Sequence, residues 1–455
     1  MSETPEASAT PEAAPKKHLV LTVFMLVAGY YQDSWRMEGS RSEELTELDL
    51  VTELTQMCER AKLDAVFFGD VVSAKTIIQG NVMTSGIYEP ITTLSALAAR
   101  TSKIGLIGTS STSFSNPFVL ARQMAGIDSL SGGRAGWNIV TSWMGGENFG
   151  YDQMPAAVDR YRRATEFVSV TNALWDSWSD DAVINNRETG WWADPEKIQA
   201  IDHEGEFFKV KGPLNMRRSP QGRPVMVQAG SSGPGMELGA TYADAIYTQQ
   251  PEKEGAKKFT QEMKALAASK GRDPESIKVL AGILPVVGRT EEEAQEIADR
   301  LEAHVNFDRA RLEFAENHGI DIDDVGLDEV IPLDRLEGTP GSVEPGGSNQ
   351  REKLIGFVRQ GHTLRQLILN AMRSGHQWAV GTPEKIADLM IDWLESGACD
   401  GFSLNPPFMP GGLKNICELL IPELQRRGYY RTEYTGSTLR EHLGLDRPGA
   451  WDTRA

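Results

Sequence analysis

Short apolar runs and amphipathic segments alternate along the chain. Eight runs are nearly continuous in apolar residues, as strands covered on both faces must be, at residues 19–29, 64–70, 104–110, 135–142, 224–230, 244–249, 278–288 and 400–406. Segments with a helical period lie between them, at residues 43–62, 90–101, 117–130, 157–178, 234–242, 252–270, 290–304 and 383–397. This alternation predicts a parallel sheet, and eight strands with eight helices favour a closed (β/α)₈ TIM barrel over the competing doubly wound open sheet.

Two gaps between the expected strands are too long for simple crossovers. Residues 180–222, after the fourth strand, contain Trp191 and Trp192 and the alternating stretch GEFFKVKGPL, and so predict an inserted hairpin. Residues 305–381, after the seventh strand, form a larger insertion with a Gly/Pro-rich stretch at 337–350 that is typical of loop or disorder. We therefore expect a disordered tail at 1–15 and a single barrel domain over 16–455 that carries both insertions.

Charge and cysteine content narrow the classes of partner. The 46 Lys and Arg residues against 64 Asp and Glu residues give a net charge of -18, which repels phosphate backbones and anionic membranes, so we expect neither nucleic acid nor a membrane as a partner. The apolar run at 19–29 is too short to span a bilayer and follows an acidic segment, which favours a core strand over a signal peptide. Cys58, Cys399 and Cys417 lack metal-ligand spacing and are typical of structural thiols in a reducing compartment, the cytoplasm.

Polar residues follow the apolar runs where barrel enzymes place their chemistry, at the carboxyl ends of the strands. An unpaired buried polar group costs about 1–3 kcal/mol, so a rim of such groups needs bonds among its own members, water or a ligand. The rim after the second to fifth strands consists of Asp70, Thr109, Ser110, Ser111, Asn138, Thr141, Ser142, Gln228, Ala229, Gly230, Ser231 and Ser232. A ligand in the barrel mouth explains the whole set better than a self-contained network does.

Two stretches suit an anion such as phosphate. In QAGSSGPG, at 228–235, small residues let the backbone approach a ligand, and the helix that follows offers its N-terminal amides. In DRYRRATEF, at 159–167, Arg160, Tyr161 and Arg163 lie on the first turns of a helix, and Arg and Tyr are natural phosphate donors. For Arg163 alone, a solvated helix face is the better interpretation.

Motifs of other enzyme classes are missing from the sequence. It has no Gly-rich dinucleotide fingerprint after a strand, no P-loop, no HExxH, no paired CxxC and no nucleophile elbow. None of the seven histidines has a partner at metal-ligand spacing. Hydrolase chemistry therefore loses support, and we expect no metal site.

Four separated motifs, in the order in which they occur, resemble the nitrilotriacetate monooxygenase component A-like group of the bacterial luciferase-like flavin monooxygenases. They lie at 89–143, which ends in GRAGWNIVTSW, at 227–235 (VQAGSSGPG), at 381–404 (GTPEKIADLMIDWLESGACDGFSL) and at 420–445 (LIPELQRRGYYRTEYTGSTLREHLGL). The likeness runs from about residue 18 to residue 443. It implies a homo-oligomeric barrel that binds reduced FMN from a separate NAD(P)H-dependent flavin reductase and uses it with O2 to oxygenate a small organic substrate of the aminopolycarboxylate, sulfone or heterocycle class.

The same resemblance assigns roles to residues of the rim, although it identifies no catalytic residue. Asp70, Thr109 and Asn138 would border the isoalloxazine ring of FMN, with Trp137 and Trp143 packed around it. On this view the polar residues of the fourth strand, which interrupt an otherwise apolar run, are there to hydrogen-bond the edge of the flavin ring.

The resemblance also assigns the ribityl phosphate to Tyr161, Ser231 and Ser232. At two places the chain departs from the family pattern: Ala157 and Tyr31 stand where relatives usually or often have His. Losing one neutral hydrogen bond is worth about 1 kcal/mol, somewhat under tenfold in affinity, so FMN binding should survive these changes.

Two further hypotheses remain open from the sequence. A deazaflavin-dependent oxidoreductase would keep the barrel and transfer hydride without oxygen. A flavin-binding protein that has lost catalysis is consistent with Ala157 in place of a histidine. Flavin-binding titrations separate the first hypothesis from FMN chemistry, and turnover on any substrate separates the second.

Overall fold

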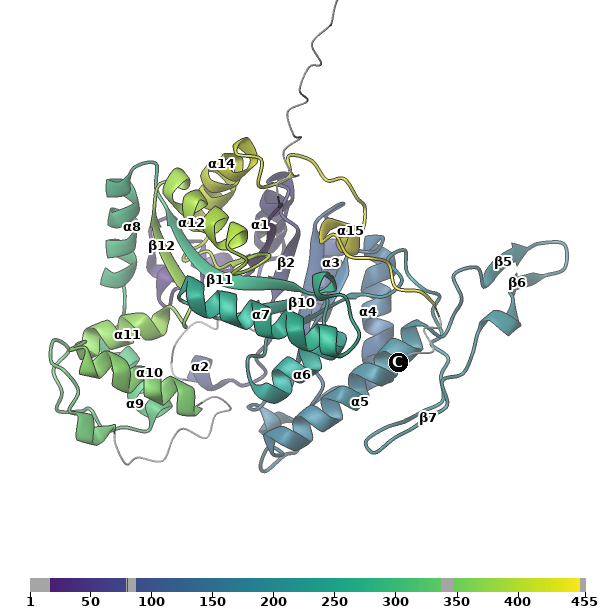
Figure 1. The fold of residues 1–455 in the computed structure, drawn as a ribbon, viewed down its shortest axis with the longest axis horizontal. Coiled ribbons are helices and arrows are strands. Elements are labelled where there is room, and N and C mark those ends of the chain that lie inside the picture. The colour runs from purple at the N-terminus through teal and green to yellow at the C-terminus, as the bar shows by residue number, and fades with distance from the viewer. Residues whose placement is uncertain (1–16, 79, 81–86, 337–346, 451–455) are drawn as a thin grey trace, which may run out of the picture.

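Eight parallel strands close into a barrel in the computed structural model, which describes residues 17–78, 80, 87–336 and 347–450 (Figure 1). The strands are β1 (Val20–Phe24), β2 (Ala65–Phe68), β3 (Gly105–Ser111), β4 (Ala135–Val140), β9 (Val225–Gln228), β10 (Ala245–Thr248), β11 (Lys278–Val287) and β13 (Gly401–Leu404). They neighbour one another in chain order, and the β10–β11 and β13–β1 pairings complete the ring. The (β/α)₈ TIM barrel is confirmed, and closure rules out the open sheet.

The barrel wall is apolar on both faces, which explains why the strands read as continuous apolar runs. In β1, Leu21 and Val23 belong to the main core between barrel and helices, whereas Val20 belongs to a separate cluster that fills the barrel. Within the barrel, Phe67 stacks between Phe24 and Tyr247, with ring centroids 4.8 and 4.7 Å apart. The interior is therefore a packed core and not a pore.

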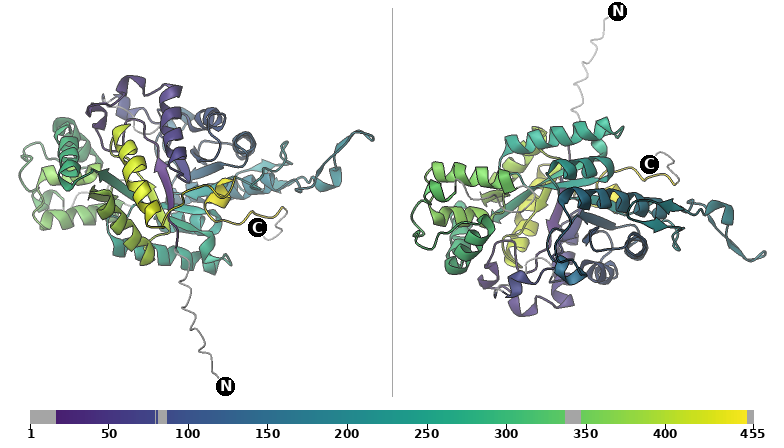
Figure 2. Two further views of the ribbon diagram at one scale, coloured as in Figure 1. Left: turned by 90° about the horizontal axis from the view of Figure 1, so that it is seen from above. Right: turned by 90° about the horizontal axis from the view of Figure 1, so that it is seen from below.

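A layer of helices covers the outside of the barrel (Figure 2). The predicted helices are present as α1 (Leu48–Arg60), α3 (Pro90–Ala98), α4 (Pro117–Ser131), α5 (Ala157–Trp175), α6 (Gly233–Tyr242), α7 (Lys253–Ser269), α8 (Glu291–Ala303) and α12 (Pro383–Glu395). Glu89, Asn116 and Thr382 are the N-caps of α3, α4 and α12. Each side chain accepts a backbone N–H of the first turn, and each of these residues is followed directly by a proline. Elements that the pattern did not predict follow β13: α13 (Gly411–Asn415), a π-helical turn (Ile416–Leu420), α14 (Ile421–Arg426) and α15 (Leu439–His442).

The chain between β11 and β13 builds a helical layer with a core of its own. It contains α9 (Phe307–His318), α10 (Gly347–Arg359), α11 (Leu364–Met372) and a ninth strand, β12 (Gln377–Gly381), which pairs with the outer half of β11. Of the stretch 337–350, predicted to be loop or disorder, residues 337–346 lie outside the described residues, as does the tail predicted at 1–15. Residues 347–350 begin α10, so the prediction was wrong there.

The segment between β4 and β9 holds two antiparallel hairpins where the sequence predicted one. β5 (Val183–Asn186) pairs with β6 (Trp191–Ala193), and β7 (His203–Glu204) pairs with β8 (Lys209–Val210). The first hairpin projects far from the barrel, whereas the second lies below α5 (Figure 1).

Residues 439–445, near the carboxyl terminus of the chain, close the end of the barrel at which its strands begin. Leu439, Leu443 and Leu445 belong to the cluster that fills the barrel, and the N–H of Leu439 donates to the carbonyl of Gly133 at 3.0 Å. A Cβ at Gly105 would lie 2.4 Å from Leu439 Cδ1, so glycine at this position makes room for the plug. The opposite end, at the carboxyl ends of the strands, is left to bind a ligand.

Candidate functional site

A cavity of about 500 Å³ lies at the carboxyl ends of β2, β3, β4 and β9. Its walls are formed by Asp70, Val71, Val72, Thr109, Ser111, Ile139, Val140, Thr141, Ser142, Trp143, Met144, Arg160, Tyr161, Gln228, Ala229, Gly230, Ser231 and Ser232. Five of the six residues that the sequence assigned to a cofactor are thus brought together in one cavity. The sixth, Asn138, is not part of its wall.

Asn138 lies beside the cavity, behind Thr109. Its Nδ2 donates to Thr109 Oγ1 at 2.9 Å, and Thr109 Oγ1 in turn donates to the Phe68 carbonyl at 2.9 Å. Both side chains are buried, and Asn138 Oδ1 has no hydrogen-bond partner among the described residues. The Asn138–Thr109 pair therefore leaves one buried acceptor, Asn138 Oδ1, without a hydrogen bond. Such an unsatisfied acceptor lowers the stability of the fold unless a ligand or a water molecule donates to it.

One end of the cavity combines two hydroxyl groups with the N-terminus of a helix. The hydroxyl oxygens of Tyr161 and Ser232 lie 3.3 Å apart, and Ser232 Oγ accepts the N–H of Gly235 at 3.3 Å, which caps α6. The first turn of α6 therefore begins at this wall, where its partial positive charge favours an anion. A Cβ at Gly235 would lie 3.1 Å from both hydroxyl oxygens, so glycine keeps this corner open.

Arg160 adds a buried positive charge to the same cavity. Arg160 lines the cavity and is almost fully buried, and its Nη1 donates to the Pro155 carbonyl at 2.5 Å. Its Nε has no partner within the described part of the chain, and burial lowers the pKa of the guanidinium. A buried guanidinium without a carboxylate calls for an anionic ligand.

Arg163, one turn along α5, is not part of the cavity. Its Nε donates to the Thr112 carbonyl at 3.1 Å, its Nη2 donates to the Ser115 carbonyl at 3.4 Å, and its guanidinium stacks on the ring of Phe208. It is half-buried and holds the loop after β3 against α5. The solvated face favoured from the sequence is therefore wrong for Arg163.

Asp70 places a carboxyl group at the far wall of the cavity. Burial, and to a lesser degree the charge of Glu89, raise the pKa of Asp70 to about 6, against a lowering by the N–H of Val71. A carboxyl group that titrates near neutral pH in a cavity wall is typical of functional sites.

The two tryptophans expected beside a flavin ring occupy different places. Trp143 is partly exposed and lines the cavity, together with Thr141 and Ser142. Trp137 is fully buried on the helix side of the barrel wall, where it packs against Phe167 and Trp175, so the expectation was wrong for this residue. Side chains of a strand alternate between its faces, and Asn138 on the inner face places Trp137 on the outer one.

The positions where relatives carry histidine also differ. Ala157 begins α5, one turn before Tyr161. Tyr31 is fully buried in the core of the helical layer, where its ring lies 5.6 Å from that of Trp378, so it does not reach the cavity.

A polar pair at the opposite side of the barrel mouth was not predicted. Tyr30 Oη and His376 Nε2 lie 2.8 Å apart, and a Cβ on Gly282 would collide with the His376 ring. Burial lowers the pKa of His376 to about 4, so its ring is neutral at pH 7. No sequence signal links the two residues, which are 346 positions apart.

No group of three or more His, Cys, Asp or Glu residues that could hold a metal ion occurs in the ranges that the structure describes. The helices of those ranges also include none with the length and hydropathy needed to cross a membrane.

An eight-stranded barrel with a polar cavity at the carboxyl ends of its strands has the architecture of the barrel enzymes, which place their active sites at that end. The chain belongs to the luciferase-like monooxygenase family, whose model matches residues 24–400. It is 43% identical over 440 residues to the N-acetyl-S-(2-succino)cysteine monooxygenase of Bacillus subtilis (strain 168), covering 95% of this chain and 98% of the relative. It is 38% identical over 447 residues to nitrilotriacetate monooxygenase component A of Aminobacter aminovorans, covering 95% and 97%.

A solved structure extends the similarity to a flavin-bound protein. Riboflavin lyase (RcaE), crystallised with modified FMN and riboflavin, superposes with a TM-score of 0.82 at 30% identity and covers 95% of this chain and 97% of its own. The resemblance to the nitrilotriacetate monooxygenase group is thus confirmed. So is the function predicted from the sequence, a two-component flavin-dependent monooxygenase, at the level of this family.

Proposed function

We propose that the cavity binds reduced FMN, delivered by a separate NAD(P)H-dependent flavin reductase, and that the protein uses it with O2 to oxygenate a small organic substrate. The observation that carries the proposal is the buried guanidinium of Arg160, which shares a cavity with Tyr161, Ser231, Ser232 and the first turn of α6. Four kinds of donor at one end suit a phosphate monoester, and the polar rim at the other end suits a flavin ring edge.

The residues of the cavity fit FMN in charge and in hydrogen-bonding groups. Arg160, Tyr161, Ser231 and Ser232 would hold the phosphate, which answers the unpaired Nε of Arg160. Asp70 and Thr109 would border the ring, and Asn138, behind Thr109, would fix the position of the Thr109 hydroxyl. When bound, reduced FMN supplies two electrons to O2, one oxygen atom of which goes to the substrate while the other leaves as water.

The protein's own share of the chemistry is to orient the ring and to exclude water. The stack of Phe24, Phe67 and Tyr247 seals the barrel beneath the rim, and the Leu439 plug seals its far end. Asp70, with its pKa raised to about 6, can take up or release a proton at the cavity wall near neutral pH. A dry cavity also limits loss of the reducing equivalents to hydrogen peroxide.

The substrate proposed is a small amine or thioether that bears carboxylates. Two relatives that match nearly the whole chain are named for nitrilotriacetate and for N-acetyl-S-(2-succino)cysteine, compounds in which carboxylate-bearing arms meet at nitrogen or sulfur. The broader class expected from the sequence also includes sulfones and heterocycles, and a relative from Rhodococcus erythropolis is a dibenzothiophene-sulfone monooxygenase at 36% identity.

We place this reaction in the cytoplasm, where NAD(P)H and a reductase are available. Cys58, Cys399 and Cys417 support this, because all three are free and buried in the structure.

The test combines purified protein with FMN, NADH, a flavin reductase and a panel of aminopolycarboxylates, succinylated thiols, sulfones and heterocycles. Oxygen uptake that matches product formation on at least one compound is the expected result. Failure to bind reduced FMN would refute the proposal, and binding without turnover on the whole panel would favour a flavin-binding protein that has lost catalysis. Binding of a deazaflavin in place of FMN would favour the hydride-transferring alternative.

A further inference from the structure

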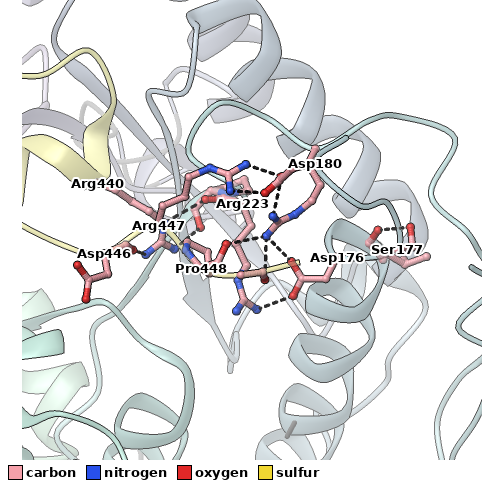
Figure 3. A network of polar contacts seen from close by, with 12 residues as sticks. Asp176, Ser177, Asp180, Arg223, Arg440, Asp446, Arg447 and Pro448 are labelled. Carbon is pink, nitrogen blue, oxygen red and sulfur yellow. Dashed lines mark hydrogen bonds and ion pairs between the residues drawn. The ribbon is translucent and has the colours of Figure 1, made fainter. Parts of the chain in front are cut away.

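An ionic network joins the carboxyl-terminal end of α5 to the carboxyl-terminal segment of the chain (Figure 3). Asp176 pairs with Arg218 at 2.9 Å and with Arg223 at 3.4 Å. Asp180 accepts from Arg218 at 2.9 Å and from Arg447 at 2.6 Å. Each carboxylate thus has two guanidinium partners within the chain, as a purely structural polar contact requires.

The pair formed by Tyr30 and His376 differs, because it lies at the carboxyl ends of the barrel strands. Leu280 belongs to the cluster that fills the barrel, and alternation along β11 places Gly282 on the same inner face. A Cβ at Gly282 would lie 1.9 Å from His376 Nδ1, so the imidazole ring takes the place of a side chain there. The ring of Tyr30 lies 6.0 Å from that of Phe24, the last residue of β1. Both rings therefore lie at the barrel mouth, next to the ends of β1 and β11.

An aromatic surface connects this pair to the flavin cavity. Phe24 is half-buried and stacks on Phe67 of β2 at 4.8 Å. The next residue of β2, Phe68, accepts at its carbonyl the hydroxyl of Thr109, which lines the cavity. A small molecule on Phe24 would therefore have Tyr30 on one side and the cavity on the other.

The hydroxyl of Tyr30 has a proton that it can donate to a ligand. His376 Nε2 lies 2.8 Å from Tyr30 Oη, whereas His376 Nδ1 is buried and has no hydrogen-bond partner in the part of the chain that the structure describes. Buried N–H groups without an acceptor are rare because of their cost, so the single proton of the neutral ring belongs on Nε2, where Tyr30 Oη accepts it. The Tyr30 proton is then left for another acceptor. The Ser374 hydroxyl also contacts Tyr30, but Ser374 is exposed, and water can replace Tyr30 as its partner.

Burial raises the pKa of Tyr30 to about 12, against a lowering by the Ser374 hydroxyl, so Tyr30 keeps its proton at neutral pH. A protonated phenol is a strong donor to an anionic oxygen. The backbone of Tyr30 is also fixed before any ligand binds, because its N–H donates to the Pro406 carbonyl at 2.9 Å. Little entropy is therefore lost when the hydroxyl meets an acceptor.

We infer that Tyr30 binds the substrate by donating a hydrogen bond to one of its carboxylate oxygens, and that His376 is a positioning residue that holds the Tyr30 hydroxyl in place. The inference rests on the proposed function, whose substrate is an amine or thioether that bears carboxylates. Bound in this way, the substrate lies over Phe24 with its nitrogen or sulfur toward the flavin cavity.

Steady-state kinetics of the full chain with FMN, NADH and a flavin reductase test the role of the hydroxyl. The probes are N-acetyl-S-(2-succino)cysteine and nitrilotriacetate, for which two relatives are named. Tyr30→Phe keeps the ring beside Phe24 and removes the hydroxyl, so the KM for a probe should rise roughly tenfold or more while the Kd for reduced FMN stays at its wild-type value. For the methyl ester of the same probe, the two proteins should differ less, because the anionic acceptor is gone.

Two substitutions of His376 separate positioning from packing. His376→Leu should raise the KM as Tyr30→Phe does, and His376→Gln, whose amide still donates to Tyr30, should restore most of the loss. Arg447→Met is the control for a purely structural contact: it breaks the ionic network at Asp180, so it should lower the melting temperature and leave the KM unchanged.

Nitrogen NMR of protein with isotopically labelled histidine reads the tautomer without flavin or substrate. The signal that is lost in His376→Gln identifies His376, and we expect its proton on Nε2. A proton on Nδ1, a KM unchanged in Tyr30→Phe, or a wild-type chain that turns over neither probe would each overturn the inference. The proposed function would survive these outcomes if the wild type oxygenates another compound of the panel, whereas failure to bind reduced FMN would refute both.

Discussion

Tyr161 and Ser232 are 71 positions apart in the sequence, and their hydroxyl oxygens lie 3.3 Å apart in the wall of the cavity. One residue comes from the second turn of α5 and the other from the cap of α6, so two helices that follow different strands meet at one anion site. If the Tyr161–Ser232 pair helps to hold a phosphate, its loss should weaken the binding of a flavin that carries a phosphate and leave the binding of a flavin without a phosphate unchanged.

Tyr161→Phe should raise the Kd for FMN by about tenfold, because it removes one hydroxyl worth about 1–1.5 kcal/mol. The Kd for riboflavin, which has no phosphate, should hardly change. Fluorescence titration with both flavins measures this. Tyr434→Phe is a matched control, because Tyr434 donates to the Leu63 carbonyl at the far end of the barrel and its loss should leave both Kd values alone.

Arg160→Met should affect FMN more strongly, since it removes a buried charge from the proposed phosphate site. Loss of one partner of a buried charged pair costs about 2 kcal/mol or more, so the Kd for FMN should rise roughly 30-fold or more. Arg163→Met removes the neighbouring guanidinium, which bonds to Thr112 and Ser115 outside the cavity. An equal loss of FMN affinity in both variants would contradict a specific role for Arg160.

Asp70→Asn should change how stability depends on pH. The pKa of Asp70 is about 6 in the folded protein against an ordinary 3.8, so the folded state holds its proton more tightly than the unfolded chain does. Asp70 therefore destabilises the fold increasingly as pH rises from about 4 to about 6. The variant should melt near the wild-type temperature at pH 4 and above it at pH 7. A melting difference independent of pH would show that Asp70 is not buried as described.

Leu439→Ala should destabilise the barrel without touching the flavin site. Leu439 is fully buried in the cluster that fills the amino-terminal end of the barrel, and truncation of such a side chain costs about 2–5 kcal/mol. Denaturant titration should show this loss, while the Kd for FMN of the folded variant stays at its wild-type value. A large change in that Kd would mean that the plug also shapes the cavity.

Local pattern was sufficient for the barrel and for most of the rim. Continuous apolar runs mark strands that are buried on both faces, and caps such as Asn116 before a proline mark helix starts, so the elements were predictable from neighbours in the sequence. Because the carboxyl ends of parallel strands meet at one end of a barrel, Asp70, Thr109 and Ser231 could be assigned to one site before their positions were known.

Only the tertiary structure decided which surfaces of the protein pack against each other. Alternation along β4 already implied that Asn138 and Trp137 face opposite sides of the barrel wall. Which of the inward-facing side chains line the cavity depends on how the ends of all the strands are arranged around the barrel. Arg160 and Arg163 both lie on the first turns of α5, but only the packed structure shows that Arg160 lines the cavity whereas Arg163 bonds to the loop after β3. The same holds for the hydrogen bond between Tyr30 and His376 and for the packing of the β7–β8 hairpin on α5. Both depend on contacts between residues far apart in the sequence, which no local period encodes. Such contacts are selected because they lower the free energy of the chain as a whole.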